Sequence, residues 1–189
     1  MVKTPSEPAQ IGMQIPEFRL PDYTGTVHDS RTLTGDHGTL IAVICTHCPY
    51  VKHIAHQLGE MAAELAATGI STVGINPNDP AANPDDGPDG MARAAEEYNF
   101  TFPYLVDATG DVARAFGAVC TPDLYLFTSS GELFYRGQFD DSRPGHARPA
   151  SGASLRSAVA DLLNNQPPPA VQKPSLGCSI KWPEQAAGQ

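Results

Sequence analysis

The sequence predicts an α/β protein whose sheet has an antiparallel edge. Short apolar runs alternate with segments that carry apolar residues at helical spacing, and a turn-separated pair of apolar runs follows them. Of the 189 residues, 41% are hydrophobic and 17% are charged. This composition supports a buried core and excludes disorder as the default. We therefore expect one domain over residues 1–189, with a core at about 11–165 and a Pro-rich tail at 166–189.

A βαβ unit is predicted first. Thr39–Ile44 is a continuous apolar run, as expected of a strand that is buried on both faces. From Cys48 to Thr68 apolar residues recur every three or four positions, which indicates an amphipathic helix. Gly69 ends this helix, because glycine accepts the left-handed conformation at a helix end. Ile70–Ile75 is the next predicted strand.

The rest of the chain continues the alternation. Residues 76–90 are rich in Pro, Asp, Asn and Gly, which predicts an irregular surface loop. An N-terminal hairpin is predicted over Phe18–Val27, and the tail is expected to be extended and to dock on the body. Three further helices are predicted: one with Met91, Ala94, Ala95 and Tyr98 on one face, one capped by Thr109 and packed through Val112 and Phe116, and a last one with Leu155, Ala158, Val159 and Leu162 inward. Pro103–Asp107 is a predicted strand, and Leu124–Phe127 and Glu132–Arg136 are the strands of a predicted hairpin with Gly131 at positive φ. The tail is expected to make its contacts through Leu176, Ile180 and Trp182.

Charge and composition exclude several classes of function. The chain has 12 basic and 21 acidic residues, a net charge of −9. This balance argues against a nucleic acid or an anionic membrane as partner. No apolar run approaches the roughly 20 residues that span a bilayer, and the start of the sequence shows no secretory signal. We therefore expect a cytoplasmic protein, in which the four cysteines are too sparse for a disulfide scaffold.

The strongest chemical signal is Cys45-Thr46-His47-Cys48-Pro49, at the junction of a predicted strand and helix. A thiol at a helix N-terminus meets unpaired N–H groups and the positive end of the helix dipole, which stabilise a thiolate. A protonated His47 would lower the thiol pKa further. The two residues between the thiols let a disulfide close within one turn, and Pro49 fits the first helical position. Half of a zinc site and two inert core thiols are the alternatives, and the junction favours redox chemistry.

A second signal is Val119-Cys120-Thr121-Pro122, which enters a predicted strand. On its own, this Pro is typical of a strand start and of a trans bond. Together with the first motif, however, it resembles the thioredoxin superfamily. The segments CTHCPYVKHI, VCTPDLYLF, FYRGQFDDSRPG and GCSIKW are similar to those of peroxiredoxin-like redoxins, and the resemblance runs from Ile11 to Trp182.

The resemblance implies a thioredoxin-like fold with a cis bond at Thr121–Pro122. It also implies that Cys45 is an exposed nucleophile and Cys48 the resolving thiol. Thr46, His47, Pro49, Thr121 and Pro122 are the expected supporting residues, and the Thr121 backbone would pair with an extended substrate.

Two departures from these relatives bear on the activity. Thioredoxins carry a buried acid in the strand before the motif, whereas Thr39–Ile44 has none, so Cys48 lacks an obvious proton acceptor. Peroxiredoxins place Pro and Thr seven and three residues before the reactive Cys. Neither Cys45 nor Cys48 fits that spacing, and thiol peroxidase activity is therefore the alternative function.

The other thiols and metal donors leave further alternatives. Cys120 and Cys178 are either a relay pair or one buried and one tail thiol. A copper or zinc site could combine Cys45 and Cys48 with His53 and His56, or with the distant His146, but the helix pattern turns His53 and His56 to the solvated face. Segment Asp85–Glu96 partly matches a calcium loop, yet Gly87 occupies a ligand position. A solvated acidic loop is expected there.

The sequence therefore predicts a thiol–disulfide oxidoreductase that uses Cys45 and Cys48, without organic cofactor or metal. Its expected partners are protein or small-molecule disulfides and dithiols, with peroxide as the alternative substrate and metal binding or delivery as a second alternative. The direction of electron flow and the oligomeric state stay open at this stage.

Overall fold

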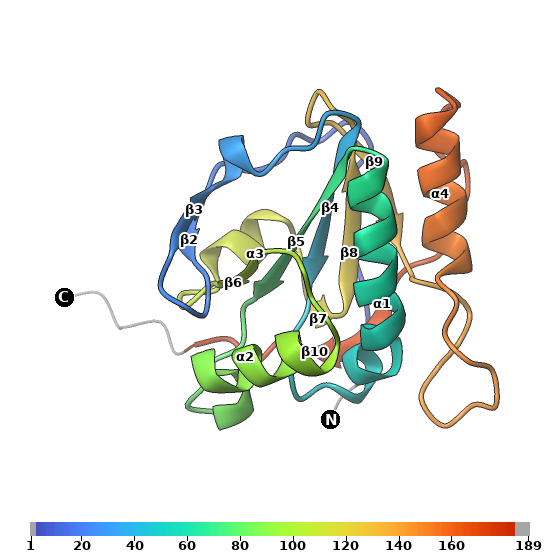
Figure 1. Cartoon of the computed structure of the whole chain (residues 1–189). Coiled ribbons are helices and arrows are strands. Elements are labelled where there is room, and N and C mark those ends of the chain that lie inside the picture. The colour runs from blue at the N-terminus through green and yellow to red at the C-terminus, as the bar shows by residue number, and fades with distance from the viewer. Residues whose placement is uncertain (1–2, 184–189) are drawn as a thin grey trace.

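The computed structural model describes residues 3–183 and confirms an α/β fold around a mixed sheet (Figure 1). The helices are α1 (Pro49–Ala67), α2 (Pro88–Glu97), α3 (Asp111–Ala115) and α4 (Ala153–Leu163), with 3₁₀ turns η1 (Ser30–Thr32) and η2 (Pro84–Asp86). The strands are β1 (Lys3–Pro5), β2 (Arg19–Pro21), β3 (Val27–Asp29), β4 (Gly38–Val43), β5 (Ile70–Asn76), β6 (Tyr104–Val106), β7 (Cys120–Thr121), β8 (Asp123–Phe127), β9 (Leu133–Gly137) and β10 (Leu176–Ser179).

The central sheet has five strands in the order β6-β5-β4-β8-β9. β4, β5 and β6 are parallel, whereas β8 and β9 add an antiparallel edge. Every residue of β4 is buried, as expected for a continuous apolar run in the middle of a covered sheet. β4 begins and ends one residue earlier than the predicted strand.

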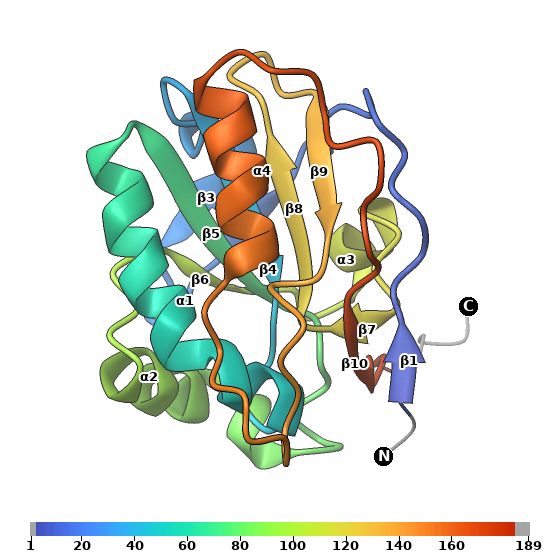
Figure 2. The ribbon, with the colours of Figure 1, turned by 90° about the vertical axis from the view of Figure 1, so that its right-hand side faces the viewer.

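Helices and a hairpin cover the two faces of the sheet. α1 and α4 lie on one face, and α3 and the β2–β3 hairpin lie on the other (Figures 1 and 2). The apolar stripe predicted on α1 is buried in the first face together with Leu155 and Val159 of α4. Phe116 and Leu20 pack in the second core with apolar residues of β4 and β5. The sheet is therefore buried on both sides.

The turn chemistry is largely as predicted. β2 and β3 pair antiparallel, with Arg19 opposite Asp29, and β8 and β9 form the second hairpin. Gly131 in that hairpin has φ of 81°, a conformation that favours glycine. The prediction of Thr109 as the cap of α3 was wrong, because Gly110 is the N-cap, in the left-handed conformation.

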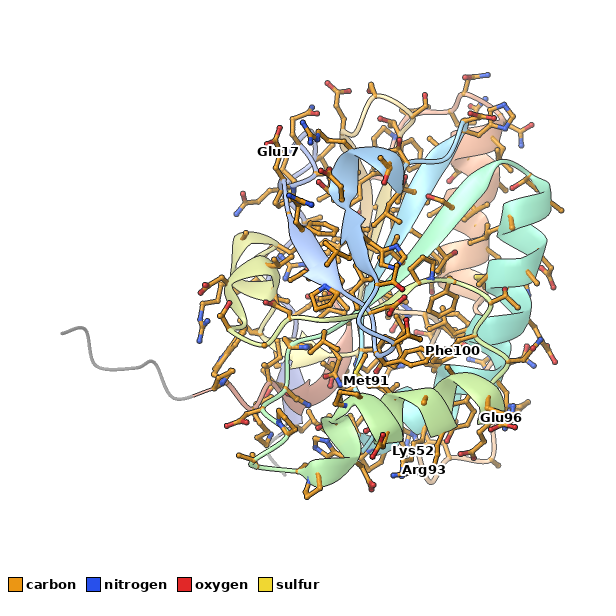
Figure 3. The ribbon with its side chains drawn as sticks, turned by 60° about the vertical axis from the view of Figure 1, so that its left-hand side comes forward. Glu17, Lys52, Met91, Arg93, Glu96 and Phe100 are labelled. Carbon is orange, nitrogen blue, oxygen red and sulfur yellow. The ribbon has the colours of Figure 1, made fainter. Side chains whose placement is uncertain are left out.

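The segment between β5 and α2 differs from its prediction. It was expected to be an irregular, solvated acidic loop, but it contains the η2 turn and leads directly into α2 at Pro88. Asp86 in this turn is only 2% exposed. Figure 3 shows α2 along the base of the molecule, with buried Met91 on the side of the sheet and exposed Arg93 on the outer side. Burial of Met91 anchors the helix that follows Asp86.

The tail contributes the middle strand of a second, three-stranded sheet, in the order β1-β10-β7 (Figure 2). Cys178 of β10 is paired with Thr121 of β7 on one side and with Lys3 of β1 on the other. Beyond β10, Ile180 and Trp182 pack against the second core. The tail thus joins both ends of the described chain to the strand that precedes Pro122. No helix among residues 3–183 has the length and apolar character needed to cross a bilayer.

Candidate active site

Sheet topology brings three distant segments to one edge. β4 ends at Val43, which lies opposite Ile75 of parallel β5 and opposite Asp123 at the start of antiparallel β8. The segments that follow β4 and β5 therefore meet the segment that precedes β8. The segment after β4 carries Cys45 and Cys48, and the segment after β5 carries Asp86. The segment before β8 carries Thr121-Pro122.

The two motif thiols lie where β4 turns into α1, and both are buried. Cys48 is the N-cap of α1, and Pro49 occupies the first turn, as predicted. Cys45 is 1% exposed and Cys48 is 0% exposed. The expectation that Cys45 is exposed was therefore wrong: the η2 turn, Thr121 and the tail strand enclose the motif.

Thr121 contacts both sulfurs. Its Oγ1 lies 3.1 Å from Cys45 Sγ, and its carbonyl oxygen lies 3.2 Å from Cys48 Sγ. The peptide bond between Thr121 and Pro122 is cis. The segment before β8 therefore faces the cysteine motif, with its backbone and its side chain directed at different thiols.

Asp86 places a buried carboxylate beside the motif. Its Oδ1 accepts hydrogen bonds from the Thr46 N–H, at 2.8 Å, and from the Thr46 hydroxyl, at 2.7 Å. Its Oδ2 lies 2.5 Å from His47 Nδ1 and accepts from Asn78 Nδ2 at 3.2 Å. These contacts satisfy the buried carboxylate, as its burial requires. They also fix the two residues between the cysteines.

Sequence reasoning missed Asp86 because it lies about forty positions after the motif, in an acidic stretch whose other acids are largely solvated. The available signal was the position of Asp86 relative to the predicted strands. In an α/β sheet, the residues that follow adjacent parallel strands converge on one edge, and Asp86 follows the strand next to β4.

The two thiols have opposite pKa shifts, and the more acidic thiol is Cys48. The hydrogen bond from Cys45 lowers the pKa of Cys48 most; burial opposes this effect, and hydrogen bonds from the Cys178 thiol and the Val51 N–H lower it further, to about 5. Burial, the hydrogen bond to Cys48 and the negative charge of Asp86 raise the pKa of Cys45 well above its usual range. The position of Cys48 at the helix N-terminus acts in the same direction, because the positive end of the helix dipole favours a thiolate.

The two further cysteines are also buried, in different surroundings. Cys178 Sγ lies 2.8 Å from Cys48 Sγ, and burial raises the pKa of Cys178 to about 12, so that Cys178 is the proton donor when Cys48 is ionised. Cys120 is 0% exposed and contacts the Pro122 carbonyl oxygen at 3.8 Å. Burial raises the pKa of Cys120 strongly.

The structure brings together a different set of metal donors from the one considered on sequence. Cys45, His47 and Asp86 place one donor atom each within 4.8 Å of one another. His53 instead contacts the Ser142 hydroxyl at 2.8 Å, and its ring is half-buried. His146 is exposed. A thiolate, an imidazole and a carboxylate suit zinc or copper, although a closed zinc site needs a fourth ligand.

A small hollow lies beside Pro122. It is lined by Tyr50 and His53 of α1 and by Asp140 and Arg143 of the segment after β9. Arg143 donates to Gln138 Oε1 at 2.6 Å and to the Asp140 carbonyl oxygen, so the segment is held by hydrogen bonds. The FYRGQFDDSRPG segment thus forms one wall next to the cis-proline.

Fold and site together define a class of protein: a thioredoxin-like redoxin with paired thiols at a strand–helix junction. The fold is shared with a secreted disulfide oxidoreductase of Mycobacterium tuberculosis, with a TM-score of 0.58 and 19% identity over 76% of this chain and 94% of that chain. Two other solved structures are much more similar. One, from Geobacillus kaustophilus, has a TM-score of 0.94 and 44% identity over 98% of this chain and 99% of that chain. The other, from Sinorhizobium meliloti, has a TM-score of 0.93 and 37% identity over 96% and 100%.

Residues 11–136 match the model of the AhpC/TSA family, and the chain belongs to this family. It is 25% identical over 125 residues to the thiol-disulfide oxidoreductase ResA of Halalkalibacterium halodurans, covering 66% of each chain. It is 33% identical over 110 residues to a candidate peroxiredoxin of Mycobacterium tuberculosis, covering 56% of this chain and 64% of that one. The chain thus spans just under two thirds of the length of these relatives, which are named for oxidoreductase activities.

Proposed function

We propose that the protein is a thiol–disulfide oxidoreductase whose Cys45 and Cys48 alternate between dithiol and disulfide. The observation that carries this proposal is the geometry of the motif: Cys45 and Cys48 lie at the N-terminus of α1, and both sulfurs contact Thr121 next to the cis-proline. A thiolate at working pH is the nucleophile of thiol–disulfide exchange. The relative named ResA supports the same reaction class.

The reaction balances within the pair and its substrate. One motif sulfur, as thiolate, attacks a substrate disulfide and releases one substrate thiolate. The second motif sulfur then attacks the first and releases the other substrate thiol, which leaves a Cys45–Cys48 disulfide. Two electrons pass to the substrate in this direction. The same steps in reverse oxidise a substrate dithiol. Proteins or small molecules with accessible disulfides or dithiols are the proposed substrates.

We assign the first attack to Cys45. Cys48 Sγ faces inward, because it contacts the Thr121 carbonyl oxygen and the tail thiol Cys178. Cys45 instead has a ring nitrogen of His47 and a carboxylate oxygen of Asp86 within 4.8 Å of its sulfur. The His47 side chain is 14% exposed. As Cys45 attacks, its proton passes to the Cys48 thiolate along their hydrogen bond, so the negative charge reaches the attacking sulfur. His47 and Asp86 provide a polar route for protons to solvent.

A glutathione redox titration tests the proposal. Thiols are trapped by alkylation at each potential and located by peptide mass. The expected result is that Cys45 and Cys48 lose alkylation together and recover it reversibly. A midpoint near about −270 mV would indicate a reductant and one near about −120 mV an oxidant. Failure of the pair to close at any potential would refute the proposal.

Peroxide reduction is the second candidate, favoured by the AhpC/TSA family match and by the peroxiredoxin relative. Here the thiolate would attack the peroxide O–O bond, forming a sulfenic acid and an alcohol or water, and the second thiol would close the disulfide with loss of water. The rates of thiol oxidation by hydrogen peroxide and by glutathione disulfide distinguish the two activities. Faster oxidation by peroxide favours peroxide reduction, and faster oxidation by glutathione disulfide favours thiol–disulfide exchange. Metal analysis of protein purified without chelator tests metal delivery through Cys45, His47 and Asp86, which requires about one ion per chain.

A further inference from the structure

The tail brings a third thiol into contact with the motif. Cys178 Sγ lies 2.8 Å from Cys48 Sγ, although the two residues are 130 positions apart. Cys178 is 3% exposed and Cys48 is 0% exposed. Cys48 therefore has a thiol neighbour on each side: Cys45 within the motif, and Cys178 on β10. Sulfurs this close need only a small approach to form a bond.

The position of Cys178 is held by strand pairing on both sides. β10 lies between β1 and β7, and Cys178 is opposite Thr121, whose backbone was expected to pair with a substrate strand. At the neighbouring position, a Cβ on Gly177 would collide with the Thr121 carbonyl oxygen, so only glycine allows this close approach. On the other side of Cys178, the Lys181 N–H donates to Asn78 Oδ1 at 2.8 Å.

From this geometry we propose that β10 is an internal substrate strand and that Cys178 is a third redox thiol. The inference rests on the proposed Cys45–Cys48 redox pair. Cys178 attacks Cys48 in the Cys45–Cys48 disulfide. A bond forms between the sulfurs of Cys178 and Cys48, the bond between Cys48 and Cys45 breaks, and the proton lost by Cys178 ends on Cys45. No external oxidant or reductant is consumed, because one disulfide replaces another.

The exchange moves the disulfide from the Cys45–Cys48 motif to the Cys48–Cys178 contact with the tail. Cys45 returns to its thiol form, while Cys48 stays bonded to the tail. The Cys48–Cys178 disulfide would also tie β10 to α1. The tail position therefore holds two oxidising equivalents, in a disulfide that no longer includes Cys45.

Cys120 provides a matched control. It is as buried as Cys48, and Ser179 of β10 is paired with it in the sheet. The sulfur of Cys120 contacts the carbonyl oxygen of Pro122, at 3.8 Å, and not another thiol. Replacing Cys120 thus removes a buried sulfur from the same region without touching the proposed relay.

Peptide mapping of the full chain tests the proposal. The protein is equilibrated in glutathione buffers, quenched with acid, alkylated and digested with trypsin. Cleavage after Arg31, Lys52, Arg156 and Lys181 places Cys45 and Cys48 together in peptide 32–52 and Cys178 in peptide 157–181. A Cys48–Cys178 disulfide joins these two peptides, whereas a Cys45–Cys48 disulfide stays within the first.

The expected result is that a joined peptide forms in the wild type and in Cys120→Ala, and is lost in Cys48→Ala and Cys178→Ala. In Cys45→Ala it should become the dominant oxidised form. If peptide 32–52 closes internally while Cys178 stays fully alkylated in the wild type, the relay is overturned and the oxidoreductase proposal stands. Persistence of the joined peptide in Cys48→Ala would overturn Cys48 as the shared sulfur. If neither peptide oxidises, both proposals fail.

Discussion

The sulfur of Cys48 lies at the N-terminus of α1, where it has hydrogen bonds with Cys45, Cys178, Val51 and Thr121. The Cys45 thiol, the Cys178 thiol and the Val51 N–H all favour its ionised form, and the hydrogen bond from Cys45 has the largest effect. Burial alone would act the other way, because it penalises a charge. The low pKa of Cys48, about 5, therefore depends on its neighbours and not on the helix end alone.

This dependence predicts the effect of removing Cys45. In Cys45→Ala the pKa of Cys48 should rise from about 5 toward the value of a free thiol, roughly 8.5. The thiolate fraction at pH 6 to 7 should then fall from nearly complete to a small part. Thiolate ultraviolet absorbance and iodoacetamide reactivity against pH measure this change. Cys120→Ala, which removes an equally buried thiol, should leave the profile unchanged; an unchanged profile in Cys45→Ala would contradict the assignment.

Asp86 acts on the other thiol. Its carboxylate has an oxygen within 4.8 Å of Cys45 Sγ, and its negative charge contributes to the raised pKa of Cys45. In a Cys48→Ser background, Asp86→Asn should lower the pKa of Cys45 by about 1, since a like charge at this distance is removed. The pH dependence of alkylation measures it. Asp85→Asn is the control, because that neighbouring side chain is 63% exposed. Equal effects of the two substitutions would show that Asp86 has no special influence.

At the residue scale, the sequence predicted the groups whose chemistry is local. The spacing of Cys45 and Cys48 and the place of Pro49 follow from a strand–helix junction, and the structure shows them there. The roles that depend on tertiary contacts were not predictable. Asp86 reaches the motif only through the pairing of β4 with β5, and the burial of Cys45 depends on segments distant in sequence.

At the element scale, α4 depends on a carboxylate outside it. Asp140 Oδ2 accepts hydrogen bonds from the N–H groups of Ser151, at 2.5 Å, and Gly152, at 2.7 Å, just before the helix begins. Burial alone would raise the pKa of Asp140, but hydrogen bonds from Ser142, Ser151 and Gly152 outweigh it and lower the pKa to about 2. Asp140 thus joins the segment after β9 to the start of α4.

The lowered pKa predicts how stability changes with pH. Because the folded pKa lies below the ordinary value of 3.8, the contribution of Asp140 is present above about pH 4 and is lost as pH falls toward 2. Asp140→Asn should therefore lower the free energy of unfolding by about 1 to 2 kcal/mol at pH 7, with little difference at pH 2. Urea unfolding at several pH values checks this. Asp141→Asn, which alters an exposed pair with Lys173, is the control and should leave the free energy of unfolding close to the wild-type value at each pH. A loss in Asp140→Asn that is independent of pH would refute the linkage.

β8 and β9 share a buried ion pair directly after the cis-proline. Arg136 donates to Asp123 Oδ2 at 2.8 Å, and both side chains are at most 2% exposed. Arg136→Met should lower the free energy of unfolding by about 3 to 5 kcal/mol, because it leaves a buried charge unpaired. Adding Asp123→Asn should recover part of that loss. Thermal unfolding measures both, and Arg93→Met, in an exposed pair with Asp85, should cost at most about 1 kcal/mol. A similar cost for the two arginines would contradict the buried-pair argument.

The elements differ in how well the sequence predicted them. α1, β4 and the β8–β9 hairpin have long periodic patterns or turn chemistry that local rules detect. β7 has two residues and β10 four, which is too short for any pattern, and their pairing is set by tertiary contacts. The three-stranded sheet that presents Cys178 to the motif was therefore not predictable, although docking of the tail through apolar residues was expected.

At the scale of the whole molecule, the tail joins the site to the opposite face of the sheet. β10 lies against Thr121 and Cys48, and a few residues later Trp182 packs against the second core. The Arg114 guanidinium lies 4.3 Å from the centre of the Trp182 ring, a cation–π contact. A displacement of β10 should therefore alter both the access to Cys48 and the surroundings of the indole.

Gly177→Ala tests this link between tail and site. The new methyl group would meet the Thr121 carbonyl oxygen, so β10 must shift, at a cost of about 1 to 3 kcal/mol in stability. Alkylation of Cys48 should become faster, and the fluorescence of Trp182, the single tryptophan, should change as its contacts loosen. Val171→Ala, at a position that is 83% exposed in the same tail, should leave both signals at wild-type values. Wild-type alkylation in a folded Gly177→Ala protein would mean that β10 does not control access to Cys48. The cover would then have to come from Thr121 and the η2 turn, which also contact the motif.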